Sequence, residues 1–312
     1  MRQNHFFALA LKKLALFISL IFICTFGDAQ QTGFATSSDG TKIFYRVYGT
    51  GTPLLIINGG PGMNSDGFEQ LAIHLSKKNQ TIIYDQRGTG KSTVVNPDSN
   101  SITMQLMVDD IESIRSQLNF KTWSVLGHSF GGMLACYYAT KHPDQIDKMI
   151  LSSSGGIDLQ LLGYVKSALA LKLTSSDKDS VAYWTKVIDN GDTSHSADLA
   201  RARFLAKAYV VDKKYIQLIA ERLTQGNPTI NKLVWENMLK IDFDCSAGIK
   251  TFDKPVLIIQ GKQDIIKAST AKKAHALLKN SKLVFMDHCA HYGWLDNEAV
   301  YYREVNKLLA NK

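Results

Sequence analysis

Apolar residues follow two distinct patterns along most of this chain: short continuous runs, and repeats at helical spacing between those runs. Short runs that are apolar nearly throughout, and partly β-branched, are typical of strands buried on both faces of a sheet. Such runs are PLLIIN (53–58), TIIYD (81–85), WSVLG (123–127), KMILSS (148–153), PVLIIQ (255–260) and LVFMD (283–287). Ahead of them, residues 33–49 hold two alternating segments around Ser38-Asp39-Gly40, a pattern that predicts a β-hairpin.

Helical periodicity fills the intervals between these runs. After Thr103, a favourable N-cap residue, apolar positions repeat at the 3.6-residue period of a helix: Met104, Met107, Val108, Ile111, Ile114 and Leu118. Residues 130–141, 267–278 and 297–310 have helical patterns as well. Strands that alternate with helices predict an α/β fold, with a mostly parallel sheet covered on both faces.

Residues 155–245 interrupt that alternation. They hold no strong strand run, and several patches in them are helical, such as YVKSALALKL and RARFLAKAYVV. We therefore expect a helical cap at 155–245, inserted between the two parts of the α/β core at 30–154 and 246–312. We use the word cap for residues 155–245 throughout.

The first 29 residues have a different character. Arg2, Lys12 and Lys13 precede the apolar stretch LALFISLIFICTF, and small residues follow up to Ala29. This order predicts a secretory signal peptide at 1–29, and hence an exported protein that is periplasmic or secreted. The alternative is a membrane anchor, but the stretch is shorter than the roughly 20 apolar residues that span a bilayer. Once the signal is cleaved, we expect no stable membrane span.

Composition excludes several function classes. The formal net charge is +8, but no run of five or more like charges occurs, so the chain does not have the basic surface of a nucleic-acid-binding protein. The four cysteines, at 24, 136, 245 and 289, lack CxxC or Cys/His spacing, so we expect no metal site. The sequence leaves oligomeric state and disulfide pairing open.

The segment DQRGTGKS (85–92) resembles a phosphate-binding loop at its end. A P-loop requires glycine where this chain has Asp85, and a helix where it has the loop-like STVVNPDSN. We therefore expect no nucleotide cofactor, and no cofactor of any other kind. Asp85 and Arg87 are instead expected to pair with each other and hold this loop near the site.

The segment GHSFGG (127–132) lies between the apolar run WSVLG and a predicted helix. G-x-S-x-G between a strand and a helix is the nucleophile elbow, a tight turn that exposes a serine hydroxyl at the carboxyl end of a sheet. Ser129 is therefore the candidate nucleophile. A Gly/Ser turn without function is the alternative. His128 adjoins Ser129 and is expected to point away from it.

A serine nucleophile requires a base and a carboxylate that orients the base. In this arrangement the chain order is serine, then acid, then histidine. Asp264 follows PVLIIQGKQ, and His291 lies in DHCAHYGW (287–294), so both come just after strands and at the same sheet edge as Ser129. Asp287 and His288, earlier in that loop, are the competing candidates.

The negative oxygen of a tetrahedral intermediate requires preorganised N–H donors. The amide of Phe130, directly after the nucleophile, is the first candidate. The second should come from the loop after the PLLII run, NGGPG (58–62), where the candidate is the amide of Gly60.

Together these segments resemble the α/β-hydrolase family, and within it the proline iminopeptidase-like serine peptidases. NGGPG, DQRGTGKS, GHSFGG and CAHYGWLDN occur in the order typical of that group, and the resemblance covers about residues 35–310. It implies a triad of Ser129, Asp264 and His291 beneath a helical cap, no cofactor, and release of N-terminal residues from small peptides.

This chain departs from the group at two places. Asn58 stands where the group has histidine. Members of the group also bind the substrate amino group through cap glutamates, one of them in a segment like ENHYF. The corresponding segment here, RFLAKAYVV (203–211), has no acid, and the glutamates of the cap are Glu221 and Glu236, with Asp212 as a further acid. We predict a serine hydrolase of small peptides, with small acyl substrates such as esters or lactones as the alternative. A non-catalytic binding protein is the less favoured third reading.

Overall fold

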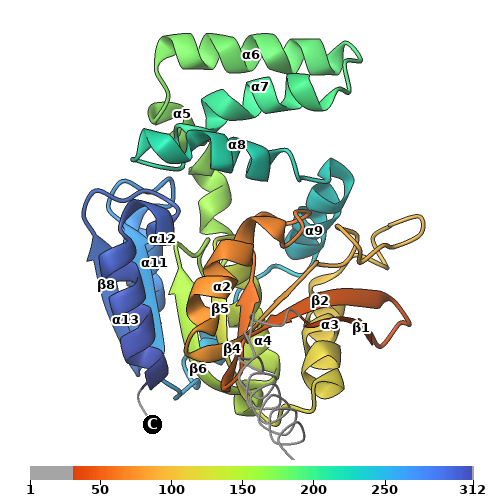
Figure 1. The fold of residues 1–312 in the computed structure, drawn as a ribbon, viewed down its shortest axis with the longest axis vertical. Helices are drawn as coiled ribbons and strands as arrows, with labels where there is room; N and C mark the ends of the chain where they lie inside the picture. Colours follow the sequence, from red (N-terminus) through yellow and green to blue (C-terminus); the bar gives the residue numbers. More distant parts are fainter. Residues whose placement is uncertain (1–30, 311–312) are drawn as a thin grey trace, which may run out of the picture.

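Eight strands form one central sheet in the order β1-β2-β4-β3-β5-β6-β7-β8 in the computed structural model, which describes residues 31–310 (Figure 1). The strands are β1 (Gln31–Thr36), β2 (Lys42–Tyr48), β3 (Thr52–Ile57), β4 (Asn79–Tyr84), β5 (Trp123–His128), β6 (Ile146–Ser152), β7 (Val256–Gly261) and β8 (Ser281–Met286). The first two form the predicted hairpin and pair antiparallel, as do β2 and β4, whereas every later pair is parallel. The predicted α/β class is confirmed.

Helices cover both faces of this sheet because its strands are apolar on both faces. In β3, Leu55 and Ile57 join the apolar cluster beneath α3 (Met104–Gln117), α4 (Phe130–Lys141) and α11 (Ala268–Leu277). Leu54 and Ile56, one position out of step, join the cluster beneath α2 (Glu69–Ser76) and α13 (Glu298–Ala310). This alternation follows from the two-residue period of a strand.

Helix α3 begins where the sequence predicts. Thr103 caps α3, because its side chain accepts a hydrogen bond from the backbone N–H of Leu106 at 3.1 Å. Such a cap satisfies one of the donors that a helix leaves open at its N-terminus.

A long helical segment connects β6 to β7, within the predicted cap and just past it. Its α-helices are α5 (Val165–Leu171), α6 (Ser175–Asp189), α7 (His195–Ala206), α8 (Ile216–Leu223), α9 (Pro228–Lys240) and α10 (Ser246–Ile249), with short 3-10 turns η3 (Leu159–Gly163) and η4 (Lys213–Tyr215). Figure 1 shows α6, α7 and α8 stacked at one end of the molecule, beyond the sheet. The cap thus lies over one end of the α/β core.

The predicted pairing of Asp85 with Arg87 is wrong. Arg87 is fully buried, and its guanidinium contacts both carboxylate oxygens of Asp110 in α3, at 2.6 and 2.8 Å, and one oxygen of Asp39 at 3.0 Å. The carboxylate of Asp85 instead accepts hydrogen bonds from the amide and hydroxyl of Ser65 and the amide of Lys91. Asp110 offers a carboxylate aligned with the guanidinium fork, whereas that of Asp85 is occupied by loop donors.

The predicted signal peptide at 1–29 lies outside the described residues. Among residues 31–310, no helix has the length and apolarity needed to cross a bilayer. Cys136, Cys245 and Cys289 are buried free thiols.

Candidate active site

Ser129 occupies the sharp turn between β5 and α4. Its φ and ψ are +56° and −121°, a backbone conformation that non-glycine residues adopt rarely and at a cost. The turn is held by the Ser129 amide, which donates to the carbonyl of Ser152, and by the Ser129 carbonyl, which accepts from Gly155. A side chain at Gly127 would collide with the backbone of Gly131, so the elbow requires glycine there. The predicted strand–turn–helix is present.

Asp264 and His291 form a buried pair. Asp264 follows β7, His291 follows β8, and the distance between Asp264 Oδ1 and His291 Nδ1 is 2.8 Å. Their side chains are 0% and 4% exposed, so water does not screen this contact. Asp264 Oδ1 also accepts the amide of Ile266, which fixes the carboxylate. A carboxylate on Nδ1 favours the tautomer with its proton there, which leaves the lone pair on Nε2.

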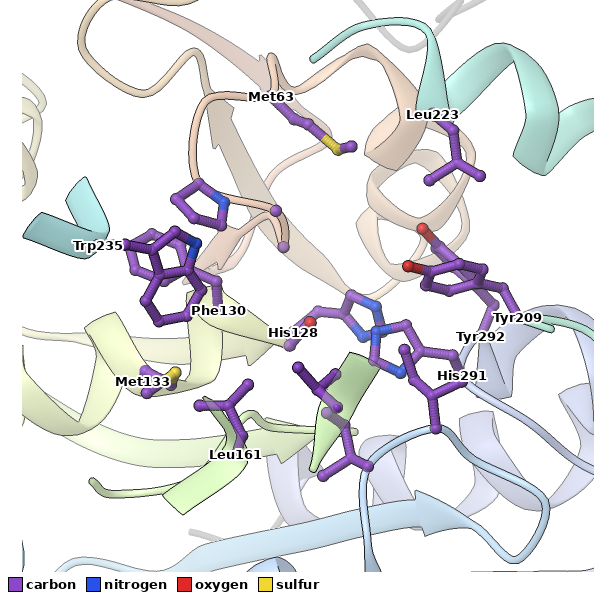
Figure 2. Close-up of a pocket in the computed structure, with 17 residues that line it drawn as sticks. Met63, His128, Phe130, Met133, Leu161, Tyr209, Leu223, Trp235, His291 and Tyr292 are labelled. Carbon is purple, nitrogen blue, oxygen red and sulfur yellow. The ribbon is translucent and has the colours of Figure 1, made fainter. Parts of the chain in front are cut away.

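Ser129 and His291 both line one cavity of about 160 Å³. Figure 2 shows this cavity with His291 labelled. Phe130, Met133, Leu161 and Trp235 line one part of it, and His128, Tyr209, Tyr292 and His291 another. Most of the lining is thus apolar or aromatic. Among the described residues that line the cavity, none is an aspartate or a glutamate.

The hydroxyl of Ser129 makes no hydrogen bond to His291 in the described part of the chain. In unliganded hydrolases the serine–histidine contact is often long and tightens only when substrate binds. The structure therefore brings the predicted nucleophile and base to one cavity without a direct bond between them.

The two competing candidates in the His291 loop lie at the surface. Asp287 pairs with Lys262 at 2.7 Å and its side chain is 69% exposed. His288 is exposed, and its positive φ of 48° marks the bend of this loop. Neither residue lines the cavity that contains Ser129.

The expectation that His128 points away from the site is wrong. Its ring lines the cavity, and its centroid lies 4.6 Å from that of His291. Tyr292 and Trp294 pack against the same ring, and this aromatic packing holds His128 beside the loop that carries His291. Burial above all, and then the proximity of His291 and Arg222, hold the pKa of His128 well below its ordinary value. His128 is therefore neutral.

Both predicted oxyanion donors lie at the cavity. Phe130 is the first residue of α4, where the helix leaves its N–H groups without intrahelical acceptors. Gly60 belongs to the segment 58–64, which we call the oxyanion loop. Gly60 has a positive φ of 71°, and its N–H has no acceptor within residues 31–310. At the preceding position, a Cβ on Gly59 would approach the Ser129 Cβ to 2.7 Å, so only glycine allows the loop to lie this close.

Asn58, which replaces the histidine of the related group, serves the loop itself. Its side-chain amide donates to the carbonyls of Met63, at 2.9 Å, and Gly59, at 3.3 Å. It is buried and does not line the cavity. Through these two hydrogen bonds, Asn58 fixes the shape of the oxyanion loop without contacting the cavity.

Comparison with known proteins identifies the family. A model of the alpha/beta hydrolase fold family matches residues 52–298. The chain belongs to the α/β-hydrolase family. The proline iminopeptidase of Lactobacillus crispatus (strain ST1) is 27% identical over 287 residues, which cover 86% of this chain and 95% of that protein. The predicted resemblance to proline iminopeptidase-like hydrolases is confirmed.

Solved structures with the same fold include enzymes of more than one activity. The esterase RhEst1 from Rhodococcus sp. ECU1013 is similar with a TM-score of 0.70 and 20% identity, over 89% of this chain and 98% of that one. The proline iminopeptidase of Mycobacterium smegmatis is similar with a TM-score of 0.68 and 19% identity, over 89% and 97%. At these identities the likeness shows the fold and leaves the substrate open.

None of the acids considered in the cap faces the cavity. Glu221 contacts His195 and Gln217 and is 44% exposed, and Glu236 lies near Lys232 and is 53% exposed. Asp212 pairs with Lys214 at 2.9 Å. A substrate amino group in this cavity would therefore meet no carboxylate from these three residues.

Proposed function

We propose that this α/β-hydrolase is a serine hydrolase that works through an acyl-enzyme. One observation carries the proposal: the buried Asp264–His291 pair and the strained Ser129 turn meet at a single cavity. That arrangement supplies nucleophile, base and orienting carboxylate in the chain order of this fold.

The chemistry follows from the positions of these groups. Ser129 Oγ attacks the substrate carbonyl carbon while its proton passes to His291 Nε2. Asp264 stabilises the resulting imidazolium, and the amides of Gly60 and Phe130 hold the negative oxygen. The intermediate collapses to an ester on Ser129, and His291 gives its proton to the leaving group. Water then attacks the ester, its proton passes through His291 back to Ser129, and the free acid departs.

The leading substrate proposal is a small peptide, cut after its N-terminal residue. It rests on the curated proline iminopeptidases, which resemble this chain over most of its length. A cavity of about 160 Å³ suits one small side chain or a proline ring.

A small carboxylic ester is the second candidate. It is favoured by the absence of aspartate and glutamate from the described cavity lining, because a protonated amino group would be buried there without a counter-charge. An uncharged acyl group carries no such cost.

A substrate panel distinguishes the two candidates. Prolyl, alanyl and leucyl p-nitroanilides are compared with p-nitrophenyl acetate and butyrate, with Ser129→Ala as the blank. Anilide turnover that depends on Ser129 supports the peptidase. Ester turnover without anilide turnover supports the esterase, and no turnover of either overturns the hydrolase proposal.

We also propose that residues 1–29 direct export and are removed. Intact mass measured on protein purified from the native cell envelope or medium tests this. A mature chain that begins at Gln30 is expected, and a chain retaining Met1 or residues 2–29 would contradict it.

A further inference from the structure

Residues of the cap donate hydrogen bonds to the carbonyl groups of the oxyanion loop, some from their side chains and one from its backbone N–H. Arg222 of α8 donates to the carbonyls of Gly59, at 3.0 Å, and Asn64, at 2.9 Å. Asn231 of α9 donates to the carbonyl of Pro61 at 2.8 Å, and the amide of Asn227 donates to the carbonyl of Gly62 at 2.7 Å. The loop that supplies an oxyanion donor is thus shaped by the cap.

Arg222 is unusual among these donors because it is a buried cation. It is 3% exposed, and it stacks over the Phe68 ring with its guanidinium carbon 5.2 Å from the ring centroid. Its side chain also donates to the side chain of Gln225 at 2.9 Å and interacts with the hydroxyl of Tyr292. Within residues 31–310 it forms no ion pair. A buried charge without a carboxylate in direct contact is costly. Carbonyl dipoles, the Phe68 ring, the Tyr292 hydroxyl and the more distant carboxylates of Asp66 and Asp85 have to offset its desolvation penalty.

The carbonyl of Gly59 and the N–H of Gly60 belong to the same peptide group. A cation on the carbonyl oxygen draws electron density from the peptide and makes its N–H a stronger donor. It also fixes the peptide plane, and therefore the direction of that N–H, which has no other acceptor in the described chain.

We propose that Arg222 is a positioning residue for the oxyanion hole, acting from the cap through the Gly59–Gly60 peptide. This rests on the proposed function, because it assigns Gly60 N–H to the negative oxygen. It makes a docked cap part of the catalytic geometry, since Arg222 leaves the Gly59 carbonyl if α8 moves away.

Loss of a merely structural role for Arg222 would also lower activity. The test must therefore measure stabilisation of the oxyanion separately from folding and substrate binding. Thionoesters serve this purpose, because sulfur accepts hydrogen bonds weakly and such substrates gain little from oxyanion donors. The ratio of rates for p-nitrophenyl acetate and its thiono analogue therefore measures the oxyanion hole. General loss of packing or of substrate binding lowers both rates together.

The experiment compares Arg222→Met, Arg222→Lys and Asn231→Ala in the full chain, with melting temperature measured for each. Asn231→Ala is the matched control, because it removes a cap-to-loop hydrogen bond from a different peptide group. Losing a whole oxyanion donor costs about 10²- to 10³-fold in kcat. We expect Arg222→Met to lower kcat for the ester by about 10- to 100-fold, with KM changed less than about threefold.

The oxo/thiono ratio should then fall about tenfold or more in Arg222→Met and stay within about twofold of wild type in Asn231→Ala. Arg222→Lys retains the charge, so its oxo/thiono ratio should lie between those of the other two variants. If Arg222→Met does not fold, Arg222→Lys is the variant that tests the inference. An unchanged ratio in a folded Arg222 variant would overturn the inference and leave the hydrolase proposal intact. An inactive wild type would overturn the hydrolase proposal, and this inference with it.

Discussion

The backbone N–H of His291 donates to the carbonyl of Tyr209, a cap residue, at 3.0 Å. The loop that carries the proposed base is therefore fastened to the cap, like the oxyanion loop. Asp296 strengthens this junction, because its carboxylate accepts the amides of Ala290 in the His291 loop and of Val211 and Asp212 in the cap, at 2.9 to 3.0 Å.

Asp296→Ala should lower both stability and turnover. The partly buried N–H groups of Ala290 and Asp212 and the exposed one of Val211 lose their acceptor, so we expect a fall of about 1–3 kcal/mol in the free energy of unfolding, measured by urea denaturation. Asp287→Ala, in the same loop, removes only an exposed contact with Lys262 and should change stability by less than about 0.5 kcal/mol. Equal losses in the two variants would show that Asp296 does not join the loop to the cap.

The strained turn at Ser129 predicts different stabilities for two inactive variants. Glycine adopts a φ of +56° without the clash that a Cβ causes, so Ser129→Gly should be more stable than Ser129→Ala by about 1 kcal/mol. Both should lose at least about 10³-fold in turnover, because neither has a nucleophile. Thermal denaturation of the pair measures the difference. A Ser129→Ala variant that is as stable as Ser129→Gly would mean that the turn stores no strain.

Removal of one member of the buried Arg87–Asp110 pair should lower the free energy of unfolding strongly. Asp110→Ala leaves the fully buried guanidinium with one carboxylate partner, the partly exposed Asp39, besides neutral acceptors, and we expect a loss of about 3–5 kcal/mol in the free energy of unfolding. Asp109→Ala, at the neighbouring half-buried position, removes only hydrogen bonds from the neutral side chains of Ser38 and Gln105 and should cost about 1 kcal/mol or less. Urea denaturation measures both. If Asp110→Ala costs no more than Asp109→Ala, the pair is not a structural element of the core.

Burial of neutral His128 predicts a pH dependence of stability. Its folded pKa lies below the value in the unfolded chain, so its contribution is fully present above about pH 6.5 and is lost as the pH falls, when only the unfolded chain takes up the proton. The slope that it contributes is at most about 1.4 kcal/mol per pH unit.

Urea denaturation of wild type and His128→Gln at several pH values between about 7 and 5 measures this contribution. The variant should lose stability less steeply on acidification, whatever its stability at neutral pH. His195→Gln is the control, because the His195 side chain is 64% exposed, and it should retain the wild-type slope. A His128→Gln slope equal to that of wild type would contradict the assignment of His128 as buried and neutral.

The sheet and the triad candidates were predictable because their signals are local. Ser129 is marked by glycines two residues to either side, and Asp264 and His291 by the strands that precede them. Parallel strands end at one edge of a sheet, so residues far apart in sequence converge there without any further information.

Contacts between remote segments were not predictable in this way. The partner of Arg87 is on α3, 23 residues onward, and the partner of Arg222 is 163 residues earlier, in the oxyanion loop. No periodicity or spacing marks either pair. The orientation of His128 was predicted wrongly because it depends on packing against Tyr292 and Trp294. These residues contact the His128 ring only once the segment after β8 has folded against β5.

The central claim, that Ser129 is made nucleophilic by His291 and Asp264, is tested most directly by reaction with a fluorophosphonate probe. Mass spectrometry of wild type should find one adduct, on the peptide that contains Ser129. Folded His291→Ala should form it at least about 10³-fold more slowly, and Ser129→Ala should form none. An unlabelled but folded wild type, or an adduct that persists in Ser129→Ala, would contradict the claim.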